Sequence, residues 1–222
     1  MITANELNEF LENAQLNEMV ATVWDLLGKN FEQAQTLLPP EQAMDRKEIS
    51  FHGQVKLLAY LCALTADLPG DIVEIGVWKG KSLSLMNEVS CRQKRLIGID
   101  PFALPNQFEE FSHYKNLIFP NVIVLRGFSE LSAERFYDLS PKVSLLHIDG
   151  GHEGRNVLLD FLLYAPSVVS EGFVVFDDYA DYQYSPEVGP AVDLLRAGGY
   201  FKGFNVLGPV RGFENSYLLQ KI

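Results

Sequence analysis

The sequence predicts an α/β fold: a Rossmann-like, doubly wound, mostly parallel sheet with a C-terminal antiparallel edge, preceded by an N-terminal helical appendage. From residue 71 onward, short apolar runs alternate with amphipathic stretches of helix length, which is typical of parallel strands joined by crossover helices. The first apolar run leads into a Gly76–Gly80 turn and then a helix, the usual first corner of such a sheet. The last two apolar runs have no helix between them, and this favours an antiparallel pair.

Residues 1–50 are expected to form the helical appendage and residues 51–222 the main domain. Thr3 and Glu6 make a capping-box pattern at the start of a first helix. A second apolar stripe, 16–27, is expected to end at Gly28, and Pro39-Pro40 prevents a helix from continuing beyond it. The apolar faces of this segment need burial, which predicts either a lid beside the functional site or a subunit interface, and in the second case a homo-oligomer.

The main domain contains a regular succession of elements. A helix over 51–66 precedes the first strand, and the parallel strands are expected over 72–76, 95–100, 122–126, 143–149 and 173–177. The helices that connect and follow them are expected over 82–91, 107–116, 129–137, 154–165 and 188–197. The antiparallel edge is expected over 200–207 and 216–221.

Composition limits the classes of protein to consider. The net charge of −11 argues against a nucleic-acid partner, because no basic stripe is available to replace counterions. The longest apolar run, 57–66, is too short to span a bilayer, and the first residues lack a signal-type apolar core, so we expect a cytoplasmic protein with no membrane partner. Cys62 and Cys91 lie in apolar helical contexts, which predicts reduced, buried thiols.

The Gly76–Gly80 turn restricts the ligand that this corner could hold. A P-loop needs four residues between its first glycine and Gly-Lys-Ser, and this turn has only three, so it is too short to wrap a phosphate. A dinucleotide site needs a glycine where the pyrophosphate approaches, and Val77 and Trp78 stand there instead. An adenosyl ligand without a phosphate fits better. We therefore expect S-adenosylmethionine to contact Gly76, Gly80 and Ser82, the last of which opens the helix.

Three further residues are candidates for binding the same ligand. Asp100 ends the second strand, where an acid accepts both hydroxyls of an adenosine ribose; the alternative is a solvated aspartate that caps the Pro101 turn. Glu74 is expected to hold the ammonium group of the ligand, or else to be a structural acid bonded to loop amides. Ser129 follows the third strand, where loops would close on the adenine, or it is a plain helix N-cap.

A second cluster of polar residues follows the fourth and fifth strands, in the segments His147-Ile-Asp149-Gly-Gly-His152 and Phe176-Asp177-Asp178-Tyr179. Because neighbouring parallel strands end at one edge, Asp149, Asp177 and Asp178 would converge beside the cofactor. Three packed acids repel one another unless a cation lies among them, and oxygen ligands suit Mg²⁺ or Mn²⁺. The alternative is that Asp177 and Asp178 cap the following loop and only Asp149 contacts a ligand.

His152 is the histidine best placed for catalysis. It lies just past Asp149 at the same edge, and a neutral imidazole accepts protons near pH 7. The alternative is a histidine that orients a loop or binds the carboxylate of the ligand. His52 and His113 show no acid partner in the sequence and His147 lies within a strand, so these three are expected to be structural.

At these residues the chain resembles the class I S-adenosylmethionine-dependent methyltransferases. The similar segments are 74–80, 148–152 and 175–179, followed by a helix that contains Ala191-Val-Asp193. The branch of the macrocin O-methyltransferases and related sugar-modifying enzymes is the most similar, and the resemblance runs from about residue 70 to the C-terminus. It implies that Asp149, Asp177 and Asp178 bind a divalent metal that engages two neighbouring hydroxyls of the substrate.

The resulting hypothesis is a metal-assisted O-methyltransferase acting on a hydroxylated small molecule, a sugar or polyol. The metal would lower the pKa of the reacting hydroxyl, and His152 or a metal-binding aspartate, Asp149 among them, would take the proton. Two alternatives remain open. One is a metal-independent or non-catalytic S-adenosylmethionine-binding protein, and the other is a nicotinamide-dependent oxidoreductase, which Asp100 alone permits and Trp78 opposes.

Overall fold

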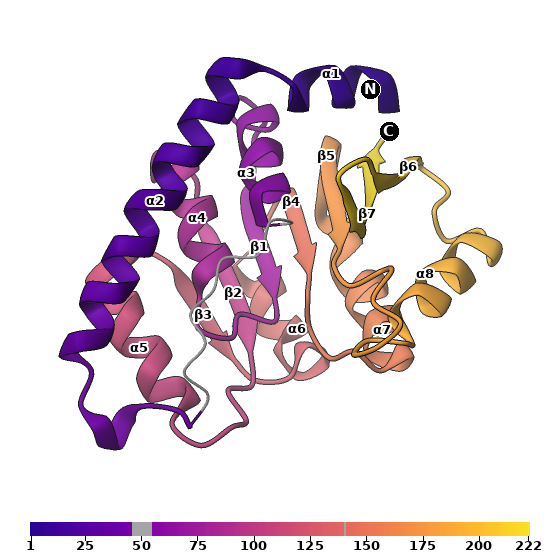
Figure 1. Cartoon of the computed structure of the whole chain (residues 1–222). Helices are drawn as coiled ribbons and strands as arrows, with labels where there is room; N and C mark the ends of the chain where they lie inside the picture. Colours follow the sequence, from indigo (N-terminus) through magenta and orange to yellow (C-terminus); the bar gives the residue numbers. More distant parts are fainter. Residues whose placement is uncertain (46–54, 140) are drawn as a thin grey trace.

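A computed structural model of the chain describes residues 1–45, 55–139 and 141–222 (Figure 1). The helices are α1 (Ala4–Leu11), α2 (Ala14–Leu37), α3 (Val55–Leu64), α4 (Lys81–Val89), α5 (Gln107–Ile118), α6 (Ser129–Asp138), α7 (Gly154–Tyr164) and α8 (Val188–Ala197), with short 3₁₀ turns at Pro40–Gln42 and Ala165–Ser167. The strands are β1 (Asp71–Ile75), β2 (Leu96–Asp100), β3 (Ile123–Arg126), β4 (Val143–Ile148), β5 (Val168–Phe176), β6 (Phe204–Val210) and β7 (Phe213–Lys221).

The strands form one sheet in the order β3-β2-β1-β4-β5-β7-β6, which confirms the predicted fold class. The strands β1 to β5 pair in parallel, whereas β7 is antiparallel to both β5 and β6. The order reverses between β1 and β4, because the chain first builds outward to β3 and then returns to the other side of β1. Ligands of doubly wound sheets bind at this reversal, outside the carboxyl ends of the strands.

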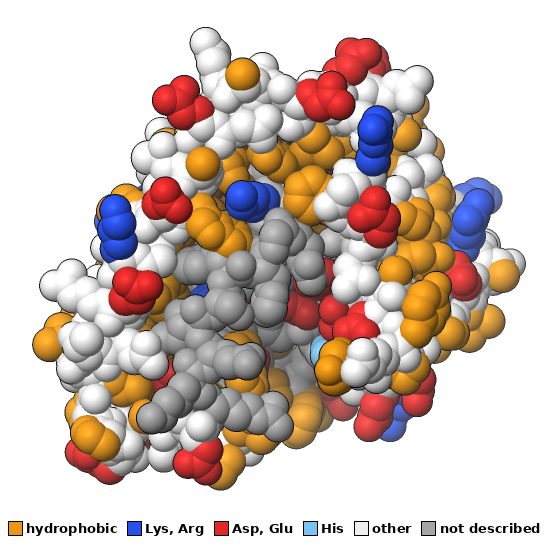
Figure 2. Space-filling view, in the orientation of Figure 1, with side chains coloured by type: hydrophobic (Ala, Val, Ile, Leu, Met, Phe, Trp, Pro, Cys, Tyr) orange, Lys and Arg blue, Asp and Glu red, His pale blue; other side chains and the backbone are white. Residues whose placement is uncertain are grey.

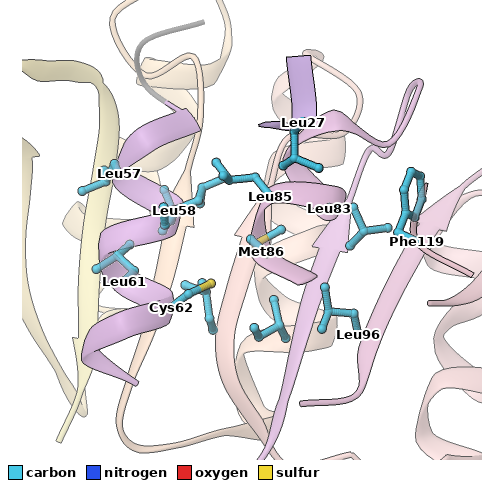
Figure 3. Packing of buried hydrophobic residues seen from close by; sticks show 14 of the residues in the cluster. Leu27, Leu57, Leu58, Leu61, Cys62, Leu83, Leu85, Met86, Leu96 and Phe119 are labelled. Carbon is cyan, nitrogen blue, oxygen red and sulfur yellow. The ribbon is translucent and has the colours of Figure 1, made fainter. Parts of the chain in front are cut away.

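Two layers of helices cover the sheet because side chains of each strand alternate between its faces. One face packs under α3, α4 and α5, with the long α2 lying across them, and the other packs under α6, α7 and α8 (Figure 1). On β1, Ile72 belongs to the first core and Val73 to the second. Figure 3 shows the first core, where Cys62 lies on the side of α3 that faces Met86 of α4. Each fully buried Leu or Ile contributes about 1.5–3 kcal/mol.

The N-terminal helices follow the sequence prediction at their start and depart from it at Gly28. The capping box at Thr3 forms, with Glu6 bonded back to the backbone of Thr3. The predicted end at Gly28 is wrong, because α2 continues to Leu37 and stops only before Pro39. Leu27 and Phe31, on either side of Gly28, are fully buried in the first core. Their packing offsets the roughly 1 kcal/mol that a glycine costs within a helix.

Two further sequence predictions have outcomes in this part of the molecule. Cys62 is buried as expected, but the prediction for Cys91 is wrong, since its thiol is exposed. The helix α4 ends at Val89, so Cys91 lies beyond it in a left-handed turn with φ 52°.

The predicted start of the helix at residue 51 lies outside the described residues. None of the helices that the structure describes is both long and apolar enough to cross a bilayer.

Candidate active site

A cavity of about 550 Å³ opens at the carboxyl ends of β1, β2 and β4, at the reversal of strand order. We divide its wall into a glycine-turn half, formed by Gly76, Trp78 and Asp100, and a carboxylate half, formed by Asp149, His152 and Asp178. In Figure 2 acidic side chains gather beside a histidine in the part of the view where Figure 1 shows the ends of β4 and β5. Volumes of this size are typical of small-molecule sites.

The glycine turn places backbone where a side chain would not fit. Gly76 has φ 86°, and a Cβ built on it would lie 1.8 Å from the carbonyl oxygen of Asp149, so the turn and the end of β4 are in direct contact. Gly80, with φ 82°, caps α4 and sits beneath the ring of Phe119, 2.4 Å from where its Cβ would be. Of the three residues predicted to contact the cofactor here, Gly76 lines the cavity, whereas Gly80 and Ser82 lie behind its wall.

Asp100 lines the cavity and also holds the glycine turn in shape. Its Oδ2 accepts hydrogen bonds from the backbone N–H groups of Val77 at 2.8 Å and Trp78 at 3.0 Å. Its Oδ1 accepts one from the N–H of Phe102 at 2.6 Å, and the side-chain amide of Gln107 lies 3.4 Å away. Both oxygens of Asp100 are therefore held by backbone donors, in a position that is only 6% exposed.

A buried ion pair supports the same turn from below. The Nζ of Lys79 lies 2.8 Å from Oε1 of Glu110 on α5, and both side chains are almost fully buried. The second oxygen of Glu110 accepts a hydrogen bond from the backbone N–H of Met44 at 2.7 Å. The carbonyl of Ala43 also accepts one from the side chain of Asn106, at the start of α5. Glu110 therefore joins α5 to both the glycine turn and the N-terminal segment, and the bond from Asn106 to Ala43 adds a second link to that segment.

Glu74 does not reach the cavity wall. Its side chain is completely buried, and its Oε1 lies 2.9 Å from Nδ1 of His147 on the adjacent strand β4, while its Oε2 has no hydrogen-bond partner among the described residues. On the other side of the imidazole, Nε2 lies 3.9 Å from Asp177. Burial lowers the pKa of His147, but the two carboxylates beside it raise that pKa well above its ordinary value. His147 is therefore part of the acidic cluster, which sequence reasoning missed.

The three aspartates lie at one edge of the sheet, but they form two groups of possible ligand atoms: Asp149 belongs to both, whereas Asp177 and Asp178 belong to different groups. Possible ligand atoms of Asp149, Asp177 and His147 lie within 4.8 Å of one another, and so do those of Asp149, Asp178 and His152. Burial, and then the charge of Asp177, raise the pKa of Asp149 well above its usual range. The same two causes raise the pKa of Asp178, although a hydrogen bond from Ser185 opposes them. The cluster therefore carries more negative charge than its surroundings balance.

This donor set fits a hard divalent cation. Carboxylate oxygens are the ligands that Mg²⁺ and Mn²⁺ prefer, and a cation would relieve the repulsion that raises the pKa of Asp149 and Asp178. Asp177 accepts a long hydrogen bond from the hydroxyl of Ser216 at 3.4 Å, and Nε2 of His147 lies 3.9 Å from it, so its carboxylate has capacity for further ligands.

His152 faces the cavity and is oriented by a hydroxyl that the sequence did not reveal. The Oγ of Ser185 lies 2.8 Å from Nδ1 of His152 and donates to Oδ2 of Asp178, also at 2.8 Å. The Nε2 of the same imidazole lies 3.2 Å from Asp178, and the His152 side chain is 46% exposed. An imidazole held in this way has an adjacent carboxylate that stabilises it once it takes up a proton. By contrast His113 bonds the carbonyl of Ala34, and His52 lies outside the described residues.

The remaining wall is formed by the turn after β3 and the start of α7. Ser129 lines the cavity beside the exposed ring of Phe128, and Asp160 of α7 lines it from beneath. The N-cap of α6 is Phe128 and Ser129 is the first residue of the helix, so the prediction of Ser129 as the N-cap is wrong. The sequence did not predict Ser185 or Asp160 as site residues, because each is a single polar residue in a loop or helix without a recognisable motif.

Comparison with known proteins matches part of the chain to a methyltransferase family and most of it to one viral protein. A profile of a family described as a methyltransferase domain matches residues 73–179. An uncharacterised protein of Acanthamoeba polyphaga mimivirus is 36% identical over 179 residues, which are 68% of this chain and 78% of that protein.

Solved structures share the fold at low identity. The O-methyltransferase NovP superposes with a TM-score of 0.62 and 19% identity, over 91% of this chain and 99% of its own. A methyltransferase of Podospora anserina with bound S-adenosylhomocysteine gives 0.60 and 16%, over 95% and 97%. A TDP-rhamnose 3′-O-methyltransferase of calicheamicin biosynthesis gives 0.59 and 17%, over 87% and 93%.

Proposed function

The chain belongs to the class I S-adenosylmethionine-dependent methyltransferases, and we propose that it is a cation-assisted O-methyltransferase acting on a sugar or polyol hydroxyl. The observation that carries the proposal is the carboxylate half of the cavity, where Asp149 and Asp178 lie beside His152, with Asp177 near Asp149 outside the cavity wall. The TDP-rhamnose enzyme with a similar fold supports a sugar acceptor. The family assignment leaves no basis for the oxidoreductase alternative.

The glycine-turn half would bind the methyl donor. Gly76 lines the part of the cavity where the amino-acid end of S-adenosylmethionine would lie, and Asp100 lines the part where the ribose hydroxyls would lie. Because Asp100 already accepts three backbone N–H bonds, a ribose hydroxyl would compete chiefly with the longer contact from Gln107. Ser129 and Phe128 would border the adenine. Glu74 lies too deep for direct contact and would act only through its neighbours.

The carboxylate half would bind and activate the acceptor. Mg²⁺ or Mn²⁺ held by Asp149, Asp177 and Asp178 would lower the pKa of the acceptor hydroxyl. His152, or alternatively Asp149, takes the hydroxyl proton, and Asp178 stabilises the imidazolium. The acceptor oxygen then attacks the methyl carbon in line, the bond from that carbon to sulfur breaks, and S-adenosylhomocysteine leaves. Correct positioning of the two substrates contributes most of the acceleration.

The test is methyl transfer from S-adenosylmethionine to a panel of sugar nucleotides, free polyols and catechols, followed by mass spectrometry. Turnover should require a divalent cation, stop in EDTA and return with Mg²⁺ or Mn²⁺. Asp177→Asn should lose at least roughly 100-fold in turnover while binding S-adenosylhomocysteine within about threefold of the native protein. Asp67→Asn, on an exposed turn at the far end of the sheet, is the matched control. Full activity after exhaustive chelation would exclude the cation and leave His152 to activate the hydroxyl alone.

We further propose that the segment 1–50 acts as a lid or a subunit interface beside the acceptor site. Its described part docks on α5 through Ala43, and the start of α5 lines the cavity. Asn106→Gly removes that bond but keeps the left-handed backbone, φ 61°, that Asn106 adopts. A lid predicts a raised KM for the acceptor with little change in cofactor affinity. An interface predicts instead a dimer in light scattering that Leu26→Glu, on the exposed face of α2, would dissociate. A monomer with an unchanged KM would contradict both.

A further inference from the structure

A second cavity, of about 440 Å³, adjoins the carboxylate half of the first and has no role in the reaction proposed above. It shares Gly150, Gly151 and His152 with the cavity that would hold the methyl donor. The rest of its described wall comes from the end of the turn before α7 and from the loop between β5 and α8, through Glu153, Tyr184, Pro186 and Glu187. We call it the outer cavity. A molecule whose hydroxyl lies beside His152 would extend into it, because the two cavities meet at that residue.

Tyr184 presents an exposed aromatic ring on a turn whose backbone is fixed. The Oδ1 of Asp181 accepts hydrogen bonds from the N–H groups of Gln183 and Tyr184, each at 3.0 Å. The next residue, Ser185, is 1% exposed and is hydrogen-bonded within the carboxylate half. The Tyr184 side chain is nevertheless 75% exposed. A tyrosine on an ordered backbone offers a large contact surface and loses little conformational entropy when it binds a ligand.

The wall of the outer cavity suits a sugar ring. The flat apolar face of an aromatic ring packs against the C–H groups on one side of a pyranose, while the hydroxyls of the sugar point outward from its edge. Glu153 and Glu187 lie on the same wall and are both exposed, so their carboxylate oxygens are available to accept hydrogen bonds from such hydroxyls. A wholly apolar acceptor would cover these two carboxylates without giving them a donor.

The same wall disfavours a phosphate group. The start of α7 would ordinarily attract an anion, because its free N–H groups and the helix dipole favour negative charge. That position is already taken by Glu187, whose Oε2 accepts a hydrogen bond from the N–H of Gly154 at 2.8 Å, where the loop after β5 lies against α7 (Figure 1). The described part of the wall contains no Lys or Arg, and the exposed Arg155 does not contribute to it. A phosphate would therefore meet Glu153 and Glu187 without a cation to balance it.

We propose that the outer cavity binds the sugar ring of an acceptor without phosphate groups, with Tyr184 stacked on the ring and Glu187 excluding phosphorylated sugars. This inference rests on the proposed methyl transfer to a sugar hydroxyl and names the class of sugar. Tyr184 supplies the attractive contact and Glu187 the repulsive one, and discrimination between similar substrates commonly needs both.

The experiment on charge measures kcat/KM for methyl transfer from S-adenosylmethionine to the methyl glycosides of glucose, galactose and rhamnose and to the three corresponding sugar 1-phosphates. The native protein should favour the neutral glycoside of a pair by at least about tenfold. Glu187→Gln keeps an acceptor oxygen for Gly154 and removes only the charge, so this ratio should fall by at least about threefold, through faster reaction of the 1-phosphate. An equal or greater kcat/KM for the 1-phosphates, or an unchanged ratio in Glu187→Gln, would overturn the exclusion of phosphate.

The experiment on stacking uses the same neutral glycosides. Tyr184→Ala should raise the KM of the glycoside by about tenfold with kcat within about twofold of the native value, and the exposure of this side chain leaves the fold intact. Tyr184→Phe keeps the ring and should keep the native KM. Tyr182→Ala is the matched control, because Tyr182 is also 75% exposed on this loop but lines neither cavity. An unchanged KM in Tyr184→Ala would overturn the stacking role.

Calorimetric binding of S-adenosylhomocysteine separates the failure of this inference from the failure of the proposed function. A protein that binds this ligand but methylates no sugar would refute the proposed function, and the inference with it. A protein that methylates sugars without the preference for neutral glycosides, or without the effect of Tyr184→Ala, would refute only the inference.

Discussion

The two halves of the cavity wall differ in how completely their polar groups are satisfied. In the glycine-turn half, Asp100 accepts three backbone hydrogen bonds and Lys79 is paired with Glu110. In the carboxylate half, Asp149 and Asp178 have raised pKa values because they are buried beside Asp177. The first half is complete without a ligand, and the second contains charges that a ligand or cation must balance. In an enzyme this arrangement is expected, because the glycine-turn half is already ordered to bind the methyl donor. The uncompensated negative charge of the carboxylate half can then be used to bind and activate the methyl acceptor.

Gly76→Ala should produce the largest loss of stability, because the added methyl group would disrupt the contact between the two halves of the cavity wall. A Cβ at this position would lie 1.8 Å from the Asp149 carbonyl, and the backbone would be forced from φ 86°. We expect a loss of more than about 4 kcal/mol in unfolding free energy, measured by urea denaturation, with no detectable cofactor binding. The control is Gly28→Ala in α2, where nothing lies within 4 Å; it should stabilise by about 0.5–1 kcal/mol. A stable Gly76→Ala protein would show that the halves move independently.

Glu110→Gln should be the next most severe, because it removes the carboxylate charge that pairs with the buried Lys79. Removing one partner of a buried pair costs about 3–5 kcal/mol, and the side chain of Glu110 also accepts from Met44 and Tyr114. Thermal and urea unfolding should both show this loss. Glu109→Gln, exposed on the same helix, should change stability by less than about 0.5 kcal/mol. Equal effects of the two substitutions would mean that the ion pair contributes nothing to the glycine turn.

Asp160→Asn should have an effect of intermediate size, and this effect on the free energy of unfolding should depend on pH. The folded pKa of Asp160 is about 6, above its unfolded value of 3.8, so the folded state binds the proton more tightly and this group becomes destabilising as pH rises from about 4 to 6. The substitution should therefore stabilise the unliganded protein by at most about 3 kcal/mol at pH 7.5. The gain should vanish near pH 3.5, which urea unfolding across this range would reveal. A gain independent of pH would contradict the raised pKa of Asp160.

Asp100→Asn should have the smallest effect of the four. The amide keeps one acceptor oxygen but directs its NH₂ group toward N–H donors of the turn, so the turn loosens and the ribose loses a charged partner. We expect the affinity for S-adenosylhomocysteine to fall by about 1–3 kcal/mol in calorimetry. If affinity is unchanged while stability falls, Asp100 shapes the turn and does not contact the ribose.

The sequence by itself determined the features that depend on local pattern and on strand order. Alternation of apolar residues predicted which elements form, and the shortness of the Gly76–Gly80 turn excluded a phosphate loop. That Asp149 lies near Asp177 and near Asp178 was also predictable, since adjacent parallel strands end at one edge, whereas the structure places Asp177 and Asp178 in different groups of possible ligand atoms.

Only the tertiary structure decided which side chains meet across elements. Glu74 pairs with His147 because β1 and β4 are neighbours in that register. Asp160 reaches the cavity because α7 packs under the turn that contains Ser129. Gly28 stays helical because Leu27 and Phe31 are buried on α4 and α5, a gain that local propensity does not contain. Contacts of this kind depend on the packing of segments far apart in the chain, and no pattern within one segment records them.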